Sequence, residues 1–405
     1  MRQFNNLVST LFITLGIFSG FSQECPPLDM EAAQTEIKEI PGETMGQKLE
    51  SLLFWSQEER AHRFSMMHAL FPSIQVAVGT EVNPLQKGLT TEPMWKGITT
   101  LKSYMNDNHV KGVLVLKDGK IRLERYADGV DAATLWTSFS VAKSVSSMLV
   151  GVALKEGAIE NLNDPLEKYI SELQGQDYGK VTVEQLLTMA SGIDWNEDYE
   201  DPNSDVAQMY LKPCEGAEAH ILTYMKPMES IHKPGTQWNY STGETDMTGI
   251  LIQKATGKSL AEYLSEHIWK PFGMEHCAYW LADECSQMNI GGSGLSASLR
   301  DYARLGLLML QNGAIEGRSV FSSSWLNRAT SPHYPINDQG DGYGYLWWCY
   351  KDGSYVALGI FGQMLYINPH KNIVIAQMAA WPRAGSEKLS NERQNFIEAV
   401  FRALD

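Results

Sequence analysis

The sequence predicts an α+β fold, in which an antiparallel sheet is flanked by helices and carries a mainly helical inserted domain. Three observations predict it: strand-like runs near residues 112–126, helical segments between Gly and Pro loops at about 161–339, and further strand-like runs beyond about 340. Strands at both ends of a chain, with helices between them, favour a sheet assembled from distant segments. A cleft between the sheet and the helical part is then the expected site.

The individual elements are indicated by different signals. Two β-rich runs surround Asp118-Gly119, a strong hairpin signal, whereas residues 139–156 are apolar almost all round, like a helix buried in a protein interior. Apolar segments between Gly and Pro loops predict later helices at 183–190, 245–255, 260–268 and 299–311. β-rich runs predict later strands at 343–350, 355–360, 365–368 and 373–378, before a last helix at 387–403.

The N-terminal region precedes the sheet and differs from it. Residues 1–22 begin with a basic residue, continue through a short apolar stretch and end in small residues, the order of a signal peptide. We therefore expect a secreted or periplasmic protein that starts near Gln23, with no stable membrane insertion; an uncleaved anchor is the alternative. Residues 23–95, with a helical stretch at about 56–71, are interpreted as a leader that packs on the core.

Residues 96–405 are interpreted as the main domain. Its α/β part comprises about 96–160 and 340–405, and its helical part about 161–339. The chain has 405 residues, of which 43% are hydrophobic and 20% charged, as in a globular protein. The net charge of −15 would repel phosphate backbones, and no run of Lys or Arg offsets it, so we exclude nucleic-acid binding.

Five cysteines are present, an odd number without metal-ligand spacing. Export would permit disulfides. We prefer a pair between Cys277 and Cys285, because a short loop could close between them; buried free thiols are the alternative.

A Ser-x-x-Lys spacing occurs at Ser140 and Lys143, at the start of the apolar helix. Residues three apart lie on one helix face, so the lysine can reach the serine hydroxyl. Burial and the positive end of the helix both disfavour a charged lysine, which could then accept the serine proton. The same spacing at Ser230 and Lys233 is followed at once by Pro-Gly, so no helix can hold that pair on one face.

A structural interpretation of the first pair is the alternative: the serine caps the helix and the lysine extends to solvent. However, Lys143 is the only charged residue of this helix before Lys155, and an unpaired buried lysine is costly unless the protein uses it. The sequence has no Gly-x-Ser-x-Gly elbow and no His-Glu-x-x-His zinc motif. We expect no metal and no cofactor.

The residues around Ser140, TLWTSFSVAKSVSSMLVGVALKEGAI, are followed by LNDPLEKYI and then VTVEQLLTMASGIDWNEDY. This succession resembles the serine β-lactamase and penicillin-binding-protein superfamily, in particular its branch of class C β-lactamase-related esterases and 6-aminohexanoate-dimer hydrolases. The resemblance extends from about residue 110 to the C-terminus. It implies a β-lactamase/transpeptidase-like fold and hydrolysis through an acyl-enzyme on Ser140.

The resemblance also implies roles for other residues. Tyr240 stands where the superfamily has the tyrosine of its Tyr-x-Asn motif, which shuttles protons; Ser241 to Glu244 also match a capping box for a helix that ends near Gly257. The segment ALGIFGQMLYINP aligns with the Lys-Thr-Gly motif. The backbone N–H groups of Ile360 and Ser140 are therefore expected to form the oxyanion hole.

One departure from the family pattern concerns the substrate. Ala357 replaces the lysine of the Lys-Thr-Gly motif, which in β-lactamases helps to bind the substrate carboxylate. We therefore expect a small ester or amide substrate rather than a penicillin, with Tyr199 on the substrate side, against the scissile amide. The glycines from Gly291 onward should allow close backbone approach near the cleft. The alternatives are a D-amino-acid peptidase or penicillin-binding protein acting on cell-wall peptides, and a catalytically silent binding module.

Overall fold

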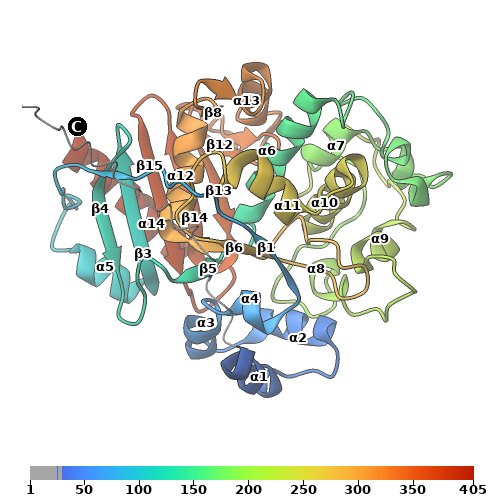
Figure 1. Ribbon diagram of the computed structural model, residues 1–405, viewed down its shortest axis with the longest axis horizontal. Coiled ribbons are helices and arrows are strands. Elements are labelled where there is room, and N and C mark those ends of the chain that lie inside the picture. Colours follow the sequence, from blue (N-terminus) through green and yellow to red (C-terminus); the bar gives the residue numbers. More distant parts are fainter. Residues whose placement is uncertain (1–24, 26–29) are drawn as a thin grey trace, which may run out of the picture.

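The computed structural model describes residue 25 and residues 30–405, and Figure 1 shows how their helices and strands are arranged. The expected signal peptide at 1–22 lies outside the described residues. No helix in the described part of the chain is long and apolar enough to cross a membrane. The architecture is α+β, as the sequence predicts, with helices packed on sheets whose strands are almost all antiparallel.

The largest sheet has nine strands in the order β10-β11-β12-β13-β14-β15-β3-β4-β2. Among the strands that the structure describes, only β2 and β4 pair in parallel. The two ends of the domain meet where β15 pairs with β3, so the expected assembly from distant segments is confirmed. The strands are β2 (Gln86–Lys87), β3 (Val110–Lys117), β4 (Lys120–Tyr126), β10 (Tyr334–Pro335), β11 (Gly342–Tyr343), β12 (Trp348–Cys349), β13 (Tyr355–Gly359), β14 (Gln363–Asn368) and β15 (Ile373–Ala379).

The predicted hairpin joins β3 to β4. Asp118 and Gly119 connect the strands with φ angles of 53° and 72°, the left-handed backbone that two-residue hairpin turns require. The expected strand at 343–350 is instead two short strands, β11 and β12, because Leu346 adopts a left-handed φ of 62° between them.

Helices cover both faces of this sheet. Leu365 of β14 lies against Gly306 of α12 (Leu299–Leu310), whereas the next residue, Tyr366, packs on Phe401 of α14 (Glu387–Leu404). Successive side chains of a strand point to opposite faces, so α12 and α14 lie on opposite sides. Helix α5 (Leu101–Asp107) shares the second side, where Tyr104 stacks on Phe396.

A second sheet, of four short strands in the order β1-β6-β7-β5, lies beside the first and was not predicted from the sequence. Each strand has three or four residues, and the sequence of β7, LSAS, lacks a run of β-branched or aromatic residues. The strands are β1 (Ser73–Val76), β5 (Leu135–Thr137), β6 (Ala278–Leu281) and β7 (Leu295–Ser298). A two-stranded hairpin of β8 (Ala314–Ile315) and β9 (Arg318–Ser319) is separate.

The helical region packs around α6 (Val141–Glu156), the predicted buried helix, in which residues 141–153 are all buried. Helix α10 contacts α6, α7 and α9. The segment predicted at 260–268 divides into α11 and a π-helical turn, Ser265–Trp269. The helices of this region are α7 (Val183–Leu187), α8 (Asp205–Gln208), α9 (His220–Met225), α10 (Thr242–Thr256), α11 (Leu260–Leu264) and α13 (Ser323–Ala329).

Four helices at the N-terminal end lie beneath the second sheet in Figure 1. The stretch predicted at 56–71 is two helices, α3 and α4, and a capping box of Ser56 and Glu59 starts the first. The elements are α1 (Met30–Glu39), α2 (Met45–Ser51), the 3₁₀ turn Leu52–Phe54, α3 (Gln57–Arg63) and α4 (Met67–Leu70). We call them the leader helices.

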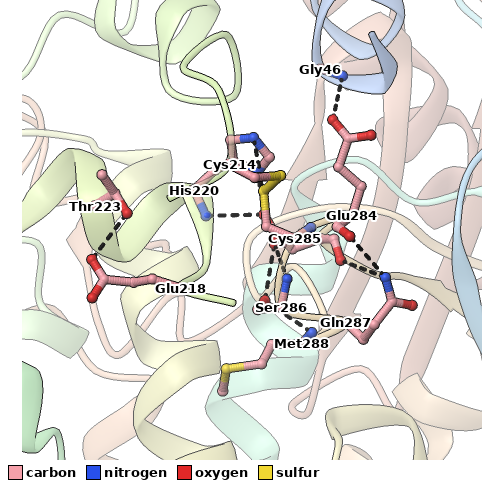
Figure 2. The surroundings of a disulfide bond; sticks show 11 residues. Gly46, Cys214, Glu218, His220, Thr223, Glu284, Cys285, Ser286, Gln287 and Met288 are labelled. Carbon is pink, nitrogen blue, oxygen red and sulfur yellow. Dashed lines mark hydrogen bonds and ion pairs between the residues drawn. A yellow bond between two sulfur atoms is a disulfide. The ribbon is translucent and has the colours of Figure 1, made fainter. Parts of the chain in front are cut away.

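The predicted disulfide between Cys277 and Cys285 is wrong. Cys25 is bonded to Cys277, and Cys214 to Cys285, with Cα–Cα distances of 5.6 and 5.5 Å; Figure 2 shows the second bond beside His220. Strand β6 runs between Cys277 and Cys285 and carries them apart. Cys349 is a buried free thiol. The Cys25–Cys277 bond ties the N-terminal region to the core.

Candidate active site

Ser140 lies directly before the first turn of α6, at the edge of the cleft. Its side chain does not cap the helix. Lys143, one turn later, is 1% exposed, so its charged end does not reach solvent. The structural alternative of a capping serine and a solvent-directed lysine therefore does not describe this pair.

The amino group of Lys143 is held by neutral partners. Its Nζ donates to Thr242 Oγ1 at 2.8 Å and to the Gly292 carbonyl oxygen at 3.1 Å, and it lies 5.5 Å from the centre of the Tyr240 ring. Burial lowers the pKa of Lys143, while the negative charges of Glu197 and Asp246 oppose that shift. Since desolvation is the larger effect, Lys143 gives up its proton more readily than an exposed lysine does.

Tyr240 lies next to Ser140. Burial raises the pKa of its hydroxyl, and a hydrogen bond with the Ser140 side chain opposes the rise. Its ring stacks on Trp348, with 5.5 Å between ring centres, and packs edge-on against Tyr343. The phenol is therefore fixed in orientation and remains protonated, as a group that donates a proton to a leaving group must be.

The expected capping box at the start of α10 forms only in part. Ser241 Oγ accepts from the Glu244 backbone N–H at 3.1 Å, and Gly257 ends the helix as predicted. The Glu244 side chain does not return to Ser241; it bonds to Ser191, and burial raises its pKa to about 8.

Glu197, which the sequence analysis did not identify, connects the candidate residues. Its carboxylate accepts from the Thr242 hydroxyl and, at 2.9 Å, from the Thr242 backbone N–H. It also accepts from the Tyr199 hydroxyl at 2.5 Å and from the Trp195 indole. A chain of hydrogen bonds thus runs from Lys143 through Thr242 to Glu197, and it fixes Tyr199 in place.

Asp246 is a second acid that the sequence analysis missed. It is 1% exposed and accepts from the Tyr210 hydroxyl and from the Gly292 backbone N–H, the latter at 2.6 Å. Burial raises its pKa to about 6, and the charge of Lys143 opposes the rise. A Cβ at Gly292 would come within 3.0 Å of Lys143 Nζ, so this glycine allows the close approach that was expected and also bonds to the lysine.

Ser140 and Ile360 both line the cleft, although they come from opposite ends of the domain. Each residue starts a helical turn, where backbone N–H groups have no intrahelical acceptor. Among the described residues, the structure gives neither N–H a hydrogen-bond acceptor. Both groups are therefore free to donate to a substrate oxygen.

Two residues with unusual backbone angles flank these N–H groups. Phe139, before Ser140, has a φ of 44°, and Phe361, after Ile360, has a φ of 61°, a region that bulky residues rarely adopt. Both rings pack on Phe64 of the leader, at 4.8 and 5.4 Å between ring centres. Since such angles persist only where the surroundings hold them, Phe64 supports both sides of the candidate oxyanion hole.

The cleft beside Ser140 is mostly apolar and contains about 700 Å³ of empty space, counted together with its opening to solvent. Tyr199 and Thr242 line it together with Ser140 and Ile360. One wall belongs to the N-terminal region, which the sequence analysis interpreted only as packing on the core. We call that wall the leader wall; it consists of Leu49, Glu50, Leu52, Leu53 and Met67.

Comparison with known proteins identifies the family. The sequence model of the family described as Beta-lactamase matches residues 98–397. The chain belongs to the Beta-lactamase family. It is 26% identical to the 6-aminohexanoate-dimer hydrolase of Paenarthrobacter ureafaciens over 369 residues, which cover 86% of this chain and 93% of that protein. The resemblance noted in the sequence is thus confirmed.

Solved structures share the fold. A Bacillus anthracis protein, provisionally assigned as a 6-aminohexanoate-dimer hydrolase, superimposes with a TM-score of 0.74 at 26% identity, over 84% of this chain and 93% of that one. EstCE1 is described as a hydrolase with promiscuous acyltransferase activity. It superimposes with a TM-score of 0.59 at 13% identity, over 74% of this chain and 96% of EstCE1. The chain is a member of the serine hydrolase superfamily that contains these proteins.

Residue 357, where the family motif has a lysine, is an alanine in this chain. Ala357 is buried in β13, where it pairs with Leu365. Within the described part of the chain, no Lys, Arg or His lines the cleft.

Proposed function

We propose that this protein is a serine hydrolase that cleaves small ester or amide bonds through an acyl-enzyme on Ser140. One observation carries the proposal: a fully buried lysine with neutral hydrogen-bond partners and a lowered pKa lies one helical turn from a serine at the mouth of a cleft. A lysine in this state can act as a general base, which an ordinary surface lysine cannot.

In the acylation step, Ser140 Oγ attacks the substrate carbonyl carbon and its proton passes to Lys143, directly or through Tyr240. The backbone N–H groups of Ser140 and Ile360 stabilise the tetrahedral oxyanion. The bond to the leaving group then breaks, and Tyr240 gives the departing oxygen or nitrogen a proton that Lys143 replaces. The products are a free alcohol or amine and an ester on Ser140.

Deacylation repeats the sequence with water. A water molecule attacks the ester carbonyl and loses its proton to the Tyr240–Lys143 pair; Ser140 leaves and takes the proton back. Tyr199, held by Glu197 at 2.5 Å, is proposed to contact the scissile amide from the substrate side.

The substrate class is supported by the cleft and by the relatives. The absence of a cation among the described lining residues disfavours penicillins and other substrates with a carboxylate near the scissile bond. Two of the relatives are named for hydrolysis of a dimer of 6-aminohexanoate. A small linear amide or ester fits both observations.

Labelling with a fluorophosphonate probe tests the proposal. Wild type should be labelled and should hydrolyse p-nitrophenyl esters, whereas Ser140→Ala should do neither and Lys143→Ala should lose about 10³-fold or more in rate. Ser230→Ala and Lys233→Ala, which alter the same spacing outside the site, are the matched controls and should behave like wild type. Full ester turnover by Ser140→Ala would contradict the proposal.

We further propose that the protein is exported and begins near Gln23. The disulfides Cys25–Cys277 and Cys214–Cys285 support export, because such bonds persist in oxidising compartments. N-terminal sequencing of the mature protein tests this: a start at Met1 would contradict cleavage.

A further inference from the structure

The disulfide between Cys214 and Cys285 joins the loop before α9 to the loop after β6, and Figure 2 shows its surroundings. Neither cysteine is among the described residues that line the cleft. Cys214 is exposed, as is the rest of the loop at 212–217, whereas Cys285 is half-buried. A thiol in solution therefore reaches the sulfur of Cys214 more easily than that of Cys285.

The sulfur of Cys285 lies beside a buried histidine. Cys285 Sγ is 3.4 Å from each ring nitrogen of His220, and His220 Nδ1 is 2.6 Å from a carboxylate oxygen of Asp283. That hydrogen bond raises the pKa of His220, although burial opposes the rise. A protonated imidazole stabilises an adjacent thiolate, so Cys285 is placed to be the sulfur that leaves when the bond is attacked.

Asp283 holds the histidine in this position. Its carboxylate also accepts from the backbone N–H groups of His220, Cys285 and Ser286, at 3.1, 3.0 and 2.8 Å. Burial opposes ionisation of Asp283, but these hydrogen bonds and the charge of His220 lower the pKa of its carboxyl. Glu284 carries an opposing charge next to Cys285 in the sequence, and its carboxylate accepts from the Gly46 N–H at 3.3 Å. The imidazole is thus the charged group that contacts the sulfur.

The segment that leads to Cys214 forms part of the cleft. We call it the α8 wall; its lining residues are Val206, Ala207, Met209 and Tyr210. The Tyr210 hydroxyl donates to Asp246, and a Cβ at Gly46 would overlap the Tyr210 backbone oxygen. The exposed loop at 212–217 begins two residues later, and its covalent link to the core is the bond at Cys214. That bond therefore limits the movement of the chain directly after the wall.

We infer that the Cys214–Cys285 bond is a thiol-exchange site for a soluble dithiol, and that its reduction frees the loop that anchors the α8 wall. One thiolate of the dithiol attacks Cys214 Sγ, the disulfide breaks, and its electron pair leaves on Cys285 Sγ beside His220. The second thiol attacks the mixed disulfide, and its proton passes to Cys214. The dithiol becomes a cyclic disulfide, and the protein gains two electrons.

Timed reduction tests the exchange site. The oxidised protein is treated with dithiothreitol, free thiols are alkylated at intervals, and the cysteine peptides are measured by mass spectrometry. In wild type, Cys214–Cys285 should open before Cys25–Cys277, because Cys277 is only 3% exposed. His220→Gln and Asp283→Asn should slow the opening of Cys214–Cys285 about tenfold and leave Cys25–Cys277 unchanged.

His232→Gln, at an exposed position, is the matched control for the reduction rates and should behave like wild type. The unchanged rate at Cys25–Cys277 serves as the folding control for the two variants at the site. Opening of Cys25–Cys277 first in wild type would overturn the inference. A rate at Cys214–Cys285 that is as high in both His220→Gln and Asp283→Asn as in wild type would also overturn it.

Limited proteolysis tests the release of the loop. Glu215 is exposed, and a glutamate-specific protease should cut after it about tenfold faster once the loop is free. Reduced and alkylated wild type should show this increase, as should the double variant Cys214→Ser with Cys285→Ser, which lacks the bond without any reduction. The double variant Cys25→Ser with Cys277→Ser is the matched control and should be cut after Glu215 like oxidised wild type.

Cutting after Glu215 that is no faster in the Cys214→Ser, Cys285→Ser double variant than in oxidised wild type would overturn the release of the loop. Neither the reduction rates nor the proteolysis requires ester or amide hydrolysis. Failure of the proposed function and failure of this inference are therefore distinguished directly, since Ser140→Ala should show the same reduction and the same cutting as wild type.

Discussion

The two sides of the cleft are built by different parts of the chain and by different chemistry. On the catalytic side, the central side chains bond to neighbouring groups: Lys143 bonds to Thr242 and Gly292, and Thr242 bonds to Glu197. On the leader wall the surface is apolar, and the single charge, Glu50, has no partner among the described residues. Polar side chains that bond to one another are held in fixed positions, whereas an unpaired charge is available to a ligand. The comparison separates the residues that would perform the reaction from those that would select the substrate.

The largest expected effect comes from the catalytic side. Tyr240→Phe keeps the ring contact with Trp348 but removes the proposed proton donor, so hydrolysis of an alkyl amide should fall about 10²–10⁴-fold in kcat. A p-nitrophenyl ester should lose less, because p-nitrophenolate leaves without a proton. Steady-state kinetics on both substrates measure the difference. Tyr345→Phe, which removes a hydroxyl bonded to Glu184 instead, is the control, and equal losses on ester and amide would contradict the assignment.

A smaller effect is expected where the leader supports the catalytic side. Phe64→Leu weakens the packing that holds Phe139 and Phe361, so the two N–H donors should be less well aligned, and kcat should fall about tenfold with little change in KM. Kinetics and thermal unfolding should be measured together. Phe54→Leu, at an exposed leader position, should change neither, and a Phe64→Leu variant with lower stability but unchanged kcat would show that the contact is only structural.

The smallest expected effect is a shift in the pH dependence of kcat/KM. Lys143 acts as a base only when uncharged, so activity should rise as pH rises through its pKa. The negative charge of Asp246 raises that pKa; Asp246→Asn should therefore move the acidic limb of kcat/KM to lower pH, by about one unit. The shift should appear above pH 6, where Asp246 is ionised. Asp194→Asn, at an exposed position, should leave the profile unchanged, and a limb that moves to higher pH in Asp246→Asn would contradict this electrostatic account.

Sequence patterns predicted those parts of the fold that have strong local signals. The hairpin at Asp118-Gly119 requires a left-handed turn, and α6 is apolar on every side, so both are indicated by a short stretch of sequence. The second sheet was missed because its strands are too short to show a period. The disulfides were mispaired because they close long loops, of 252 and 71 positions, and only the folded chain brings those cysteines together.

The residues of the candidate site likewise include some that sequence patterns identified and others that they missed. Ser140 and Lys143 were identified from their spacing on a helix, and Tyr240, Ile360 and Tyr199 from family resemblance; the structure brings all of them to one cleft or its edge. Glu197 was missed because it lies in an acid-rich loop, where nothing in the sequence distinguishes the carboxylate that turns inward from its solvated neighbours. Asp246 and Glu50 were missed because each is buried by contacts with segments that are distant in the sequence.

The sheet topology also has a consequence for synthesis of the chain. Trp136, four residues before the nucleophile, donates to Gln363 Oε1 at 3.1 Å across 227 positions, and Ile360 lies in that same distant segment. The ribosome therefore makes Ser140 and Lys143 long before it makes Ile360, the second proposed oxyanion donor, or strand β15, which joins the two ends of the sheet. Such distant pairings form late in folding. An incomplete chain would carry Ser140 without the groups proposed to stabilise the transition state, so the proposed hydrolysis should begin only after Ile360 and strand β15 have been made.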